Sequence, residues 1–190
     1  MAWYHRDMTP KDRWIDEGLT VLQQEGIGGV RIDRIAARLG LTKGSFHHHF
    51  DGVGDFHRSL LERYESDATA RIDSAVESLD RLPPQRVLVD ASAQISGDAG
   101  REAAIRGWAS QDEVARATLR RTDAARLAAL TTVWQRIVPD ETLARSAAMI
   151  PYLILIGSAV AVPPPSEQEL ADVFALLATL IPAVPGADDQ

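Results

Sequence analysis

The sequence predicts an all-α protein of 190 residues. Apolar residues recur at the three- and four-residue spacing of amphipathic helices along most of the chain. Prolines, glycines and capping sequences divide these segments into ordinary helix lengths. No alternating pattern of β-branched residues predicts a strand. A hydrophobic content of 45% is ample for a packed core, and the length suits one or two small domains.

The first helix is predicted to begin at Thr9 and Pro10. A threonine hydroxyl can cap the first turn, and proline suits the first helical position because its missing N–H would have no partner there. Apolar residues at helical spacing continue to Leu22, and Gly26 ends the helix. Residues 27–29 are then expected to form a flexible turn.

Residues 32–50, IDRIAARLGLTKGSFHHHF, predict two short helices joined by a tight turn. The first helix has one apolar stripe, which consists of Ile32, Ile35, Ala36 and Leu39. Gly40 stops it, because glycine adopts the left-handed conformation without a Cβ clash. Thr42 can cap the second helix. Phe46 and Phe50 are expected to point into the core.

The second short helix is left with small, polar and basic side chains on its outer face. These residues are Lys43, Gly44, Ser45, His47 and His48, and His49 is expected to pack partly under the turn. A short exposed helix of this kind suits insertion into the DNA major groove. Arg31 stands at the entry to the preceding helix, where a guanidinium and backbone amides can bind phosphate. The alternative for Arg31 is a solvated surface arginine.

At these residues the chain resembles the helix-turn-helix of the TetR family of bacterial transcriptional repressors. The family pattern appears here as Ile35-Ala36, Leu39-Gly40-Leu41-Thr42, Lys43-Gly44-Ser45-Phe46 and His47-His48-His49-Phe50. Two positions that commonly touch the operator depart from it: His47 replaces a tyrosine, and Val53 replaces a lysine. We therefore expect fewer phosphate contacts than is usual, or compensation by Arg31 and Lys43.

The resemblance implies about nine helices, three of them in an N-terminal helix-turn-helix head. It implies a DNA-binding domain over residues 1–54 and a ligand-binding and dimerisation domain over residues 55–185. Residues 186–190 are expected to be a disordered tail. The implied DNA-binding residues are Arg31, Thr42, Lys43, Gly44, Ser45, His47, His48 and His49.

The middle of the chain predicts further helices. A long helix runs from about residue 55 toward residue 82, where a double proline breaks it. Helices over residues 85–95 and 100–109 follow. Residues 110–113, SQDE, predict a capping box in which serine and glutamate satisfy each other's end amides, opening a long helix that ends before Pro139.

The last two predicted helices are unusually apolar. The first starts at Asp140 and ends at the triple proline 163–165, and a capping box at residues 166–169 opens the second. Residues 147–162 carry no charge, but they are too few for a membrane span and include Pro151, so a buried helix is predicted. A helix that is apolar all round must be buried on every side. We expect a homodimer interface, as the resemblance implies, with burial in the monomer's own core as the alternative.

Aromatic residues in the body suggest where a small molecule binds. An aromatic-walled cavity with a few polar groups is a usual ligand site, and the resemblance implies an inducer in this body. The candidate residues are Trp108, Gln111, Trp134 and Tyr152. Core packing is the alternative for each, because large aromatic residues dominate cores.

Composition and motifs exclude several other classes of protein. There is no cysteine, so neither a disulfide nor a thiolate metal site is expected. Adjacent helical residues point about 100° apart, so His47, His48 and His49 cannot converge on one metal ion. The chain has no phosphate-binding glycine loop, nucleophile elbow or His-x-x-x-His pair, so neither enzyme activity nor a cofactor is expected. The start of the sequence lacks the apolar region of a signal peptide, which favours a cytoplasmic protein without a membrane segment.

The charge distribution is compatible with DNA binding. The net charge is −7, but residues 1–50 contain seven lysines and arginines against six acidic residues. A near-neutral head on an acidic body can bind DNA if its few cations face the phosphates. Protonation of the exposed histidines at about pH 6 would add positive charge, so the affinity for DNA is expected to rise as the pH falls.

The sequence thus predicts a ligand-responsive transcriptional repressor. It would bind a near-palindromic operator in double-stranded DNA as a homodimer, and a small-molecule inducer would release it. One alternative is a helical protein that binds small molecules or proteins and carries a degenerate DNA-binding head. The other is an enzyme or metal protein that uses the histidine cluster.

Overall fold

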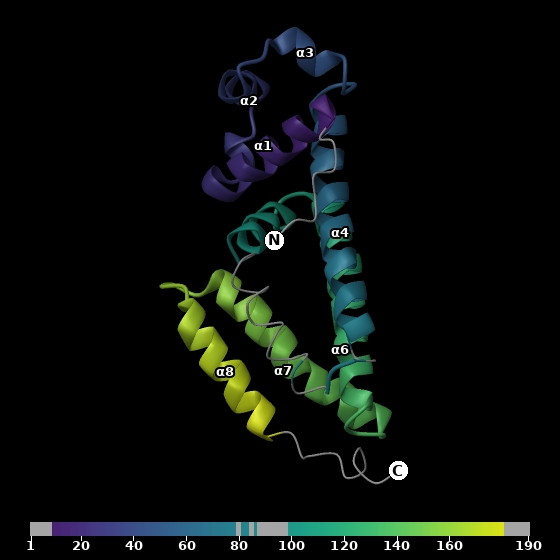
Figure 1. Cartoon of the computed structure of the whole chain (residues 1–190). Coiled ribbons are helices and arrows are strands. Elements are labelled where there is room, and N and C mark those ends of the chain that lie inside the picture. Colours follow the sequence, from purple (N-terminus) through teal and green to yellow (C-terminus); the bar gives the residue numbers. More distant parts are fainter. Residues whose placement is uncertain (1–8, 79–80, 84–85, 87–98, 181–190) are drawn as a thin grey trace. The chain divides into compact units, whose positions relative to one another are not determined.

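All regular secondary structure in the computed structural model is helical (Figure 1), over the described residues 9–78, 81–83, 86 and 99–180. The predicted all-α fold is confirmed. The chain divides into two compact units. Unit 1 comprises residues 1–67 and 103–119, and unit 2 comprises residues 68–102 and 120–190.

Helix α1 (Pro10–Glu25) begins where the sequence predicts. The Asp12 amide donates to the Thr9 hydroxyl at 3.2 Å, and the Thr9 amide donates to the Asp12 carboxylate at 3.1 Å. This reciprocal capping box satisfies amides that have no partner inside the helix. Gly26 follows with φ of 71°, a conformation that glycine adopts without steric cost, and so ends the helix.

Two short helices follow α1 in unit 1. The predicted flexible turn at residues 27–29 is instead the 3₁₀ helix η1 (Ile27–Gly29). Helix α2 (Ile32–Leu39) ends at Gly40, whose φ of 66° is left-handed, as predicted. Helix α3 (Lys43–His47) is only five residues long, and the Ser45 amide lies 3.4 Å from the Thr42 hydroxyl that caps it.

Helix α4 (Val53–Ser78) is slightly shorter than predicted at its C-terminal end. The helix predicted over residues 85–95 lies outside the described residues except for residue 86, and residues 99–109 are helical as expected. The capping box predicted before α6 (Glu113–Gln135) is wrong. The Ser110 hydroxyl donates to the Gly107 carbonyl at 2.7 Å, and Asp112 caps the helix by accepting from the Ala115 amide at 2.8 Å.

Helices α7 (Glu141–Val160) and α8 (Glu167–Leu180) begin at their predicted caps. The Leu143 amide donates to Asp140 at 2.8 Å. The Ser166 amide donates to the Glu169 carboxylate at 2.8 Å, and the Glu169 amide donates to the Ser166 hydroxyl at 3.2 Å. Asp140 and Ser166 therefore fix where the two apolar helices start.

Each unit has its own hydrophobic cluster. The unit 1 cluster is rich in aromatic side chains, and its largest members are Trp14, Phe46, Phe50, Phe56, Tyr64 and Trp108. The unit 2 cluster joins α6, α7 and α8 through Val133, Trp134, Ala144, Ala148, Phe174 and Leu177. Unit 2 also buries an ion pair, in which Arg126 donates to both carboxylate oxygens of Glu102 at 3.0 and 2.9 Å.

Candidate nucleic-acid interface

Aromatic packing fixes the orientation of α3. Phe46 is fully buried, and its ring centroid lies 5.4 Å from that of Trp14, 5.0 Å from Phe50 and 5.5 Å from Phe56. The contacts with Trp14 and Phe56 are edge-on, which is a favourable geometry for aromatic pairs. Because one face of this five-residue helix is held by rings from α1 and α4, the opposite face is presented outward.

The outward face carries most of the residues predicted to contact DNA. The exposed ones are Arg31, Thr42, Lys43, Gly44, His47 and His48, while Ser45 and His49 are half-buried. A Cβ at Gly44 would meet only the Thr42 hydroxyl, at 3.7 Å, so the backbone here is open to close approach. The predicted orientation of Phe46 and Phe50 into the core is confirmed.

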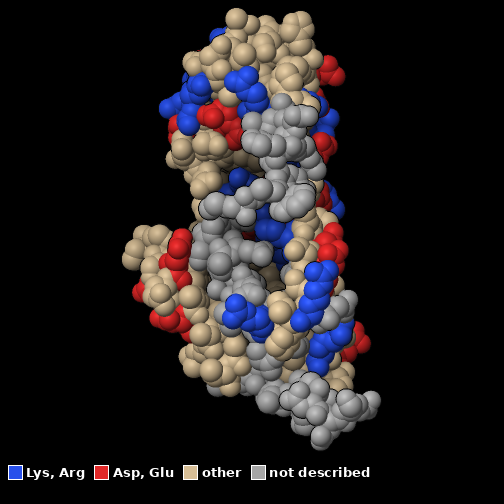
Figure 2. All heavy atoms as spheres, viewed as in Figure 1, with Lys and Arg blue, Asp and Glu red and all other residues tan. Residues whose placement is uncertain are grey.

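Most arginines of the head are paired with acidic side chains. Arg31 lies 3.4 Å from Asp33, and Arg34 and Arg38 contact carboxylates of α1. Within the described residues Lys43 forms no ion pair. In Figure 2 the end of unit 1 that carries α3, at the top, is mostly uncharged, and the basic side chains visible below it lie among acidic ones. A DNA phosphate at Arg31 would have to compete with Asp33.

The three consecutive histidines of residues 47–49 are not part of a metal-binding arrangement of described side chains. Among the described residues no set of three or more histidine, aspartate or glutamate side chains is arranged to hold a metal ion. The His47 ring instead packs edge-on against Phe46, with 5.3 Å between centroids. Its imidazole therefore remains on the outer face of α3.

Long-range contacts join α1 to the first half of α4, and the sequence gives no local signal of them. Arg63 donates to Asp16 at 2.7 Å and also to Asp12. The hydrogen bond from the Thr9 hydroxyl, and also the charge of Arg63, lower the pKa of Asp12 against the opposing effect of burial. Gly18 lies so close to α4 that an added Cβ would be 2.6 Å from the Phe56 ring. In Figure 1, α1, α2 and α3 accordingly gather at the first turns of α4.

His57 of α4 is a half-buried side chain whose packing the sequence did not predict. Its ring lies edge-on to Trp108, with 5.2 Å between centroids, and its buried Nε2 atom has no hydrogen-bond partner among the described residues. Burial lowers the pKa of His57, and the nearby carboxylate of Asp112 acts in the opposite direction. This side chain therefore packs α4 against the helix over residues 99–109 inside unit 1.

The four predicted ligand-binding residues are divided between the units. Trp108 is buried in the aromatic cluster of unit 1, and Gln111 is exposed in the following turn. Trp134 is buried in the unit 2 cluster, where no described residue accepts from its indole N–H, and Tyr152 of α7 is half-buried. Their role in ligand binding remains a prediction.

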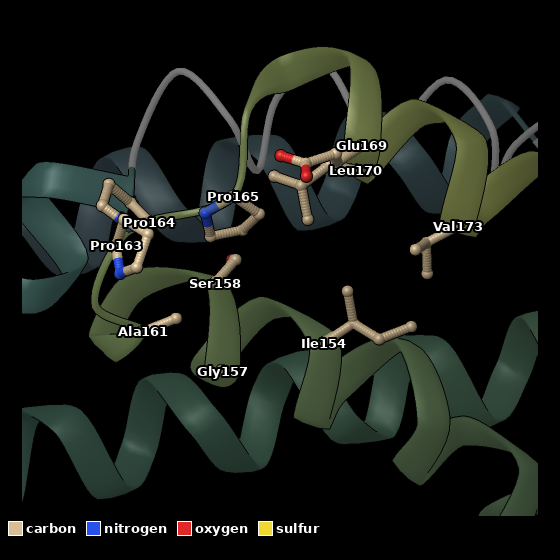
Figure 3. A pocket seen from close by; sticks show the side chains of 10 residues that line it. All are labelled: Ile154, Gly157, Ser158, Ala161, Pro163, Pro164, Pro165, Glu169, Leu170 and Val173. Carbon is tan, nitrogen blue, oxygen red and sulfur yellow. The ribbon is translucent and has the colours of Figure 1, made fainter.

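A pocket of about 440 Å³ lies elsewhere in unit 2, between α7, the triple proline 163–165 and α8 (Figure 3). Its walls are mainly apolar, and Ile154 of α7 and Val173 of α8 point toward one another across it. Ser158 and Glu169 are the polar side chains of its lining. None of the predicted ligand residues lines this pocket.

Helices α7 and α8 leave large apolar side chains exposed in the single chain. These are Leu143, Ile150, Leu153 and Val160 of α7, and Val173 and Leu176 of α8. Helix α7 is long and apolar enough to span a membrane, by length and composition alone, and 22% of its apolar window is buried within the chain. Within the described part of the chain, α7 is therefore covered only in part.

Comparison with known proteins gives a family match over the head. Residues 15–52 match the family described as bacterial regulatory proteins, tetR family. The matched range includes most of α1, all of α2 and α3, and the turn before α4. It contains every predicted DNA-binding residue.

Other comparisons cover more of the chain than the family match does. Over 81 residues, 43% of this chain, the sequence is 31% identical to the HTH-type transcriptional repressor DhaR of Mycobacterium sp. (strain GP1), and this stretch spans 40% of that repressor. A transcriptional regulator from Rhodococcus sp. Rha1 has a TM-score of 0.71 at 20% identity, covering 91% of this chain and 96% of its own. The multidrug binding protein EbrR, complexed with imidazole, has a TM-score of 0.59 at 24% identity, covering 95% and 99%. The fold of the chain is therefore similar to the folds of these two proteins.

Proposed function

We propose that this TetR-family protein is a ligand-responsive transcriptional repressor. It binds a near-palindromic operator as a homodimer and leaves the DNA when a small-molecule inducer binds. The observation that carries the proposal is the exposed face of α3, which is held outward by the buried ring of Phe46 within a family-matched head. As a repressor of this kind it acts in the cytoplasm, where the chromosome is.

In this proposal the head contacts both the base edges and the phosphates of DNA. Lys43 and Ser45 lie on α3, where they reach base edges or phosphates once α3 enters a major groove. Arg31 precedes α2 and binds phosphate after it releases Asp33. Two heads related by a twofold axis read two half-sites, which is why the operator is near-palindromic.

The dimer interface in this proposal is formed by α7 and α8. Six large aliphatic side chains are exposed on these two helices. A contiguous exposed apolar surface on a protein chain marks an interaction site. A second copy of the same helix pair covers it with an identical surface, which is the simplest closed arrangement for a homodimer.

The ligand site in this proposal lies in the helical body. The fold is known to hold small molecules, since EbrR is a multidrug-binding protein that was solved with imidazole. The buried N–H of Trp134 has no hydrogen-bond partner in the described part of the chain, so it can donate to a polar atom of a ligand. An inducer releases DNA only if it binds the DNA-free conformation more tightly than the DNA-bound one.

The proposal is tested by fluorescence anisotropy on duplex DNA that flanks the protein's own gene, beside a scrambled duplex, across a series of salt concentrations. Preferential binding to the native duplex at physiological salt is expected. If the protein binds no duplex in a salt-dependent way, the repressor proposal is wrong. The departures at His47 and Val53 would then favour a helical binding protein with a degenerate head.

Two substitutions separate phosphate contact from sequence reading. Arg31→Ala is expected to weaken binding to native and scrambled duplexes alike and to lower the salt slope by about 1. Ser45→Ala is expected to reduce the preference for the native duplex with little change in salt slope. If neither variant changes binding to the native duplex, α3 is not the reading helix.

A further inference from the structure

We infer that Lys11 of α1 is a further DNA-contacting residue, which binds a backbone phosphate beside the C-terminal end of α3. This inference rests on the proposed DNA-binding function. The family match begins at residue 15, so Lys11 lies outside it. Nothing in the local sequence around Lys11 distinguishes it from other surface lysines.

The position of the Lys11 ammonium is the first observation. Its Nζ atom lies 5.1 Å from the centroid of the Phe50 ring. Phe50 is buried and follows the last residue of α3, His47, by three positions. A cation over an aromatic face at an exposed site gains only about 0.5–1 kcal/mol, and the ammonium keeps donors free for an anion.

The phase of α1 explains why Lys11 reaches this point. Residues three and four apart share one face of a helix, so Lys11 lies one turn before Trp14 and Ile15, which are both buried. Trp14 packs against Phe46 of α3, with 5.4 Å between ring centroids. The face of α1 that carries Trp14 and Ile15 therefore packs toward α3. Lys11 lies on the same face one turn earlier, where the helix is exposed.

The first turn of α1 is also held firmly in place. Thr9 and Asp12 form the capping box on either side of Lys11. Asp12 in turn accepts from Arg63 of α4. A lysine on a fixed turn loses less conformational freedom on binding phosphate than one on a mobile segment.

Charge pairing is the second, independent observation. Arg31, Arg34, Arg38 and Arg63 all have carboxylate partners in the head. Within the described part of the chain, Lys11 and Lys43 have none, so neither must give up an ion pair to bind DNA. Lys43 is the first residue of α3, and Lys11 lies over Phe50, three residues after the last, so the two cations lie near opposite ends of α3.

Arg13 offers a matched control on the same turn. It is exposed and has no ion pair in the described part of the chain. Two helical positions correspond to a rotation of about 200°, so Arg13 points away from the side of α1 that carries Lys11. It therefore differs from Lys11 in direction, and not in charge or position along the helix.

The test compares Lys11→Met, Lys11→Arg and Arg13→Met with the wild type by anisotropy on the native and scrambled duplexes across the salt series. Methionine keeps an apolar chain over Phe50 and removes the charge. We expect Lys11→Met to lower the slope of log affinity against log salt by about 0.9 on both duplexes. Lys11→Arg and Arg13→Met should retain the wild-type slope.

The possible outcomes are distinct. If Lys11→Met binds with the wild-type slope, the inference is wrong, and a lowered melting temperature in the same variant would show that Lys11 only shields Phe50. If Arg13→Met lowers the slope as much as Lys11→Met does, the effect is general electrostatics and the inference also fails. If the wild type itself binds no duplex, the proposed repressor function fails as well.

Discussion

The hydrophobic cluster of unit 1 is covered by its own chain, whereas the apolar helices of unit 2 are covered only on one side. In unit 1, Trp14, Phe46 and Phe56 are at most 1% exposed. In unit 2 the buried side of α7 consists of small residues such as Ala144 and Ala148, which let α6 and α8 approach closely. Its larger residues, such as Leu153, point outward.

This difference separates two uses of apolar surface. A closed aromatic core specifies the shape of one chain, because each ring has fixed neighbours. An open aliphatic surface specifies association, because its favourable burial is realised only when a partner arrives. The following substitutions test that division, beginning with the largest expected effect.

Phe46→Ala should remove the centre of the closed core. Phenylalanine-to-alanine changes at fully buried sites cost about 3–5 kcal/mol, so a large fall in the urea midpoint and loss of DNA binding are expected. His47→Ala, at the exposed neighbouring position, should change stability by less than about 0.5 kcal/mol. Similar urea midpoints for the two variants would contradict a closed core in unit 1.

Leu153→Glu should damage association and leave the fold of the single chain intact. A twofold interface buries the substituted residue twice, and an unpaired buried charge costs about 3 kcal/mol or more, so dimerisation should weaken at least roughly 100-fold. Sedimentation velocity measures the change, and Leu153→Met should remain dimeric. A wild type that sediments as a monomer at micromolar concentration would contradict the proposed interface.

Gly18→Ala should show how tightly α1 and α4 pack in the closed unit. The new Cβ would lie 2.6 Å from the Phe56 ring and 2.8 Å from Leu60. Overpacking of this kind costs about 1–3 kcal/mol, which exceeds the gain of about 1 kcal/mol in helix propensity. Gly107→Ala, where a Cβ meets nothing within 4 Å, should instead stabilise the protein. Thermal melting distinguishes the two, and equal shifts would disprove the close packing.

The smallest expected effect is a pH dependence from His57. Burial against Trp108 lowers the pKa of His57 in the folded protein, so the unfolded chain binds this proton more readily. Stability from this group is therefore complete above about pH 6.5, the ordinary histidine value, and is lost as the pH falls toward the lower folded pKa. His57→Phe should reduce the change in melting temperature between about pH 7 and 5. Asp112→Asn, which keeps a capping side chain, should make the melting temperature depend more steeply on pH. If the melting temperatures of wild type and His57→Phe change with pH in parallel, His57 does not contribute to the pH dependence.

The sequence predicted best the helix ends and caps, because residues close together in the chain determine them. Gly40 ends α2, and Thr9, Asp140 and Ser166 cap helices as predicted, because each of these interactions spans only a few residues. The error at α6 has the same local origin. Ser110 and Asp112 are both acceptable caps, and local sequence does not reveal which of them the following helix uses.

Contacts between distant segments could not be predicted. Arg63 contacts Asp16, which is 47 residues away, and His57 contacts Trp108, which is 51 residues away. No helical periodicity or short motif in the sequence indicates contacts at such separations. Trp108 was predicted as a possible ligand residue because tryptophans line binding sites as well as cores. The structure gives Trp108 a packing role in the unit 1 cluster, and its contact with a ligand remains a prediction.

The aromatic core of unit 1 also bears on how such a protein can be recombined. Ile105 and Trp108 belong to the same cluster as Trp14 and Phe46, although they lie far along the chain. A chimera that exchanged only residues 1–54 would separate side chains that were selected together. Grafting the head onto a foreign body therefore requires residues 103–119 to be transferred, or matched, as well.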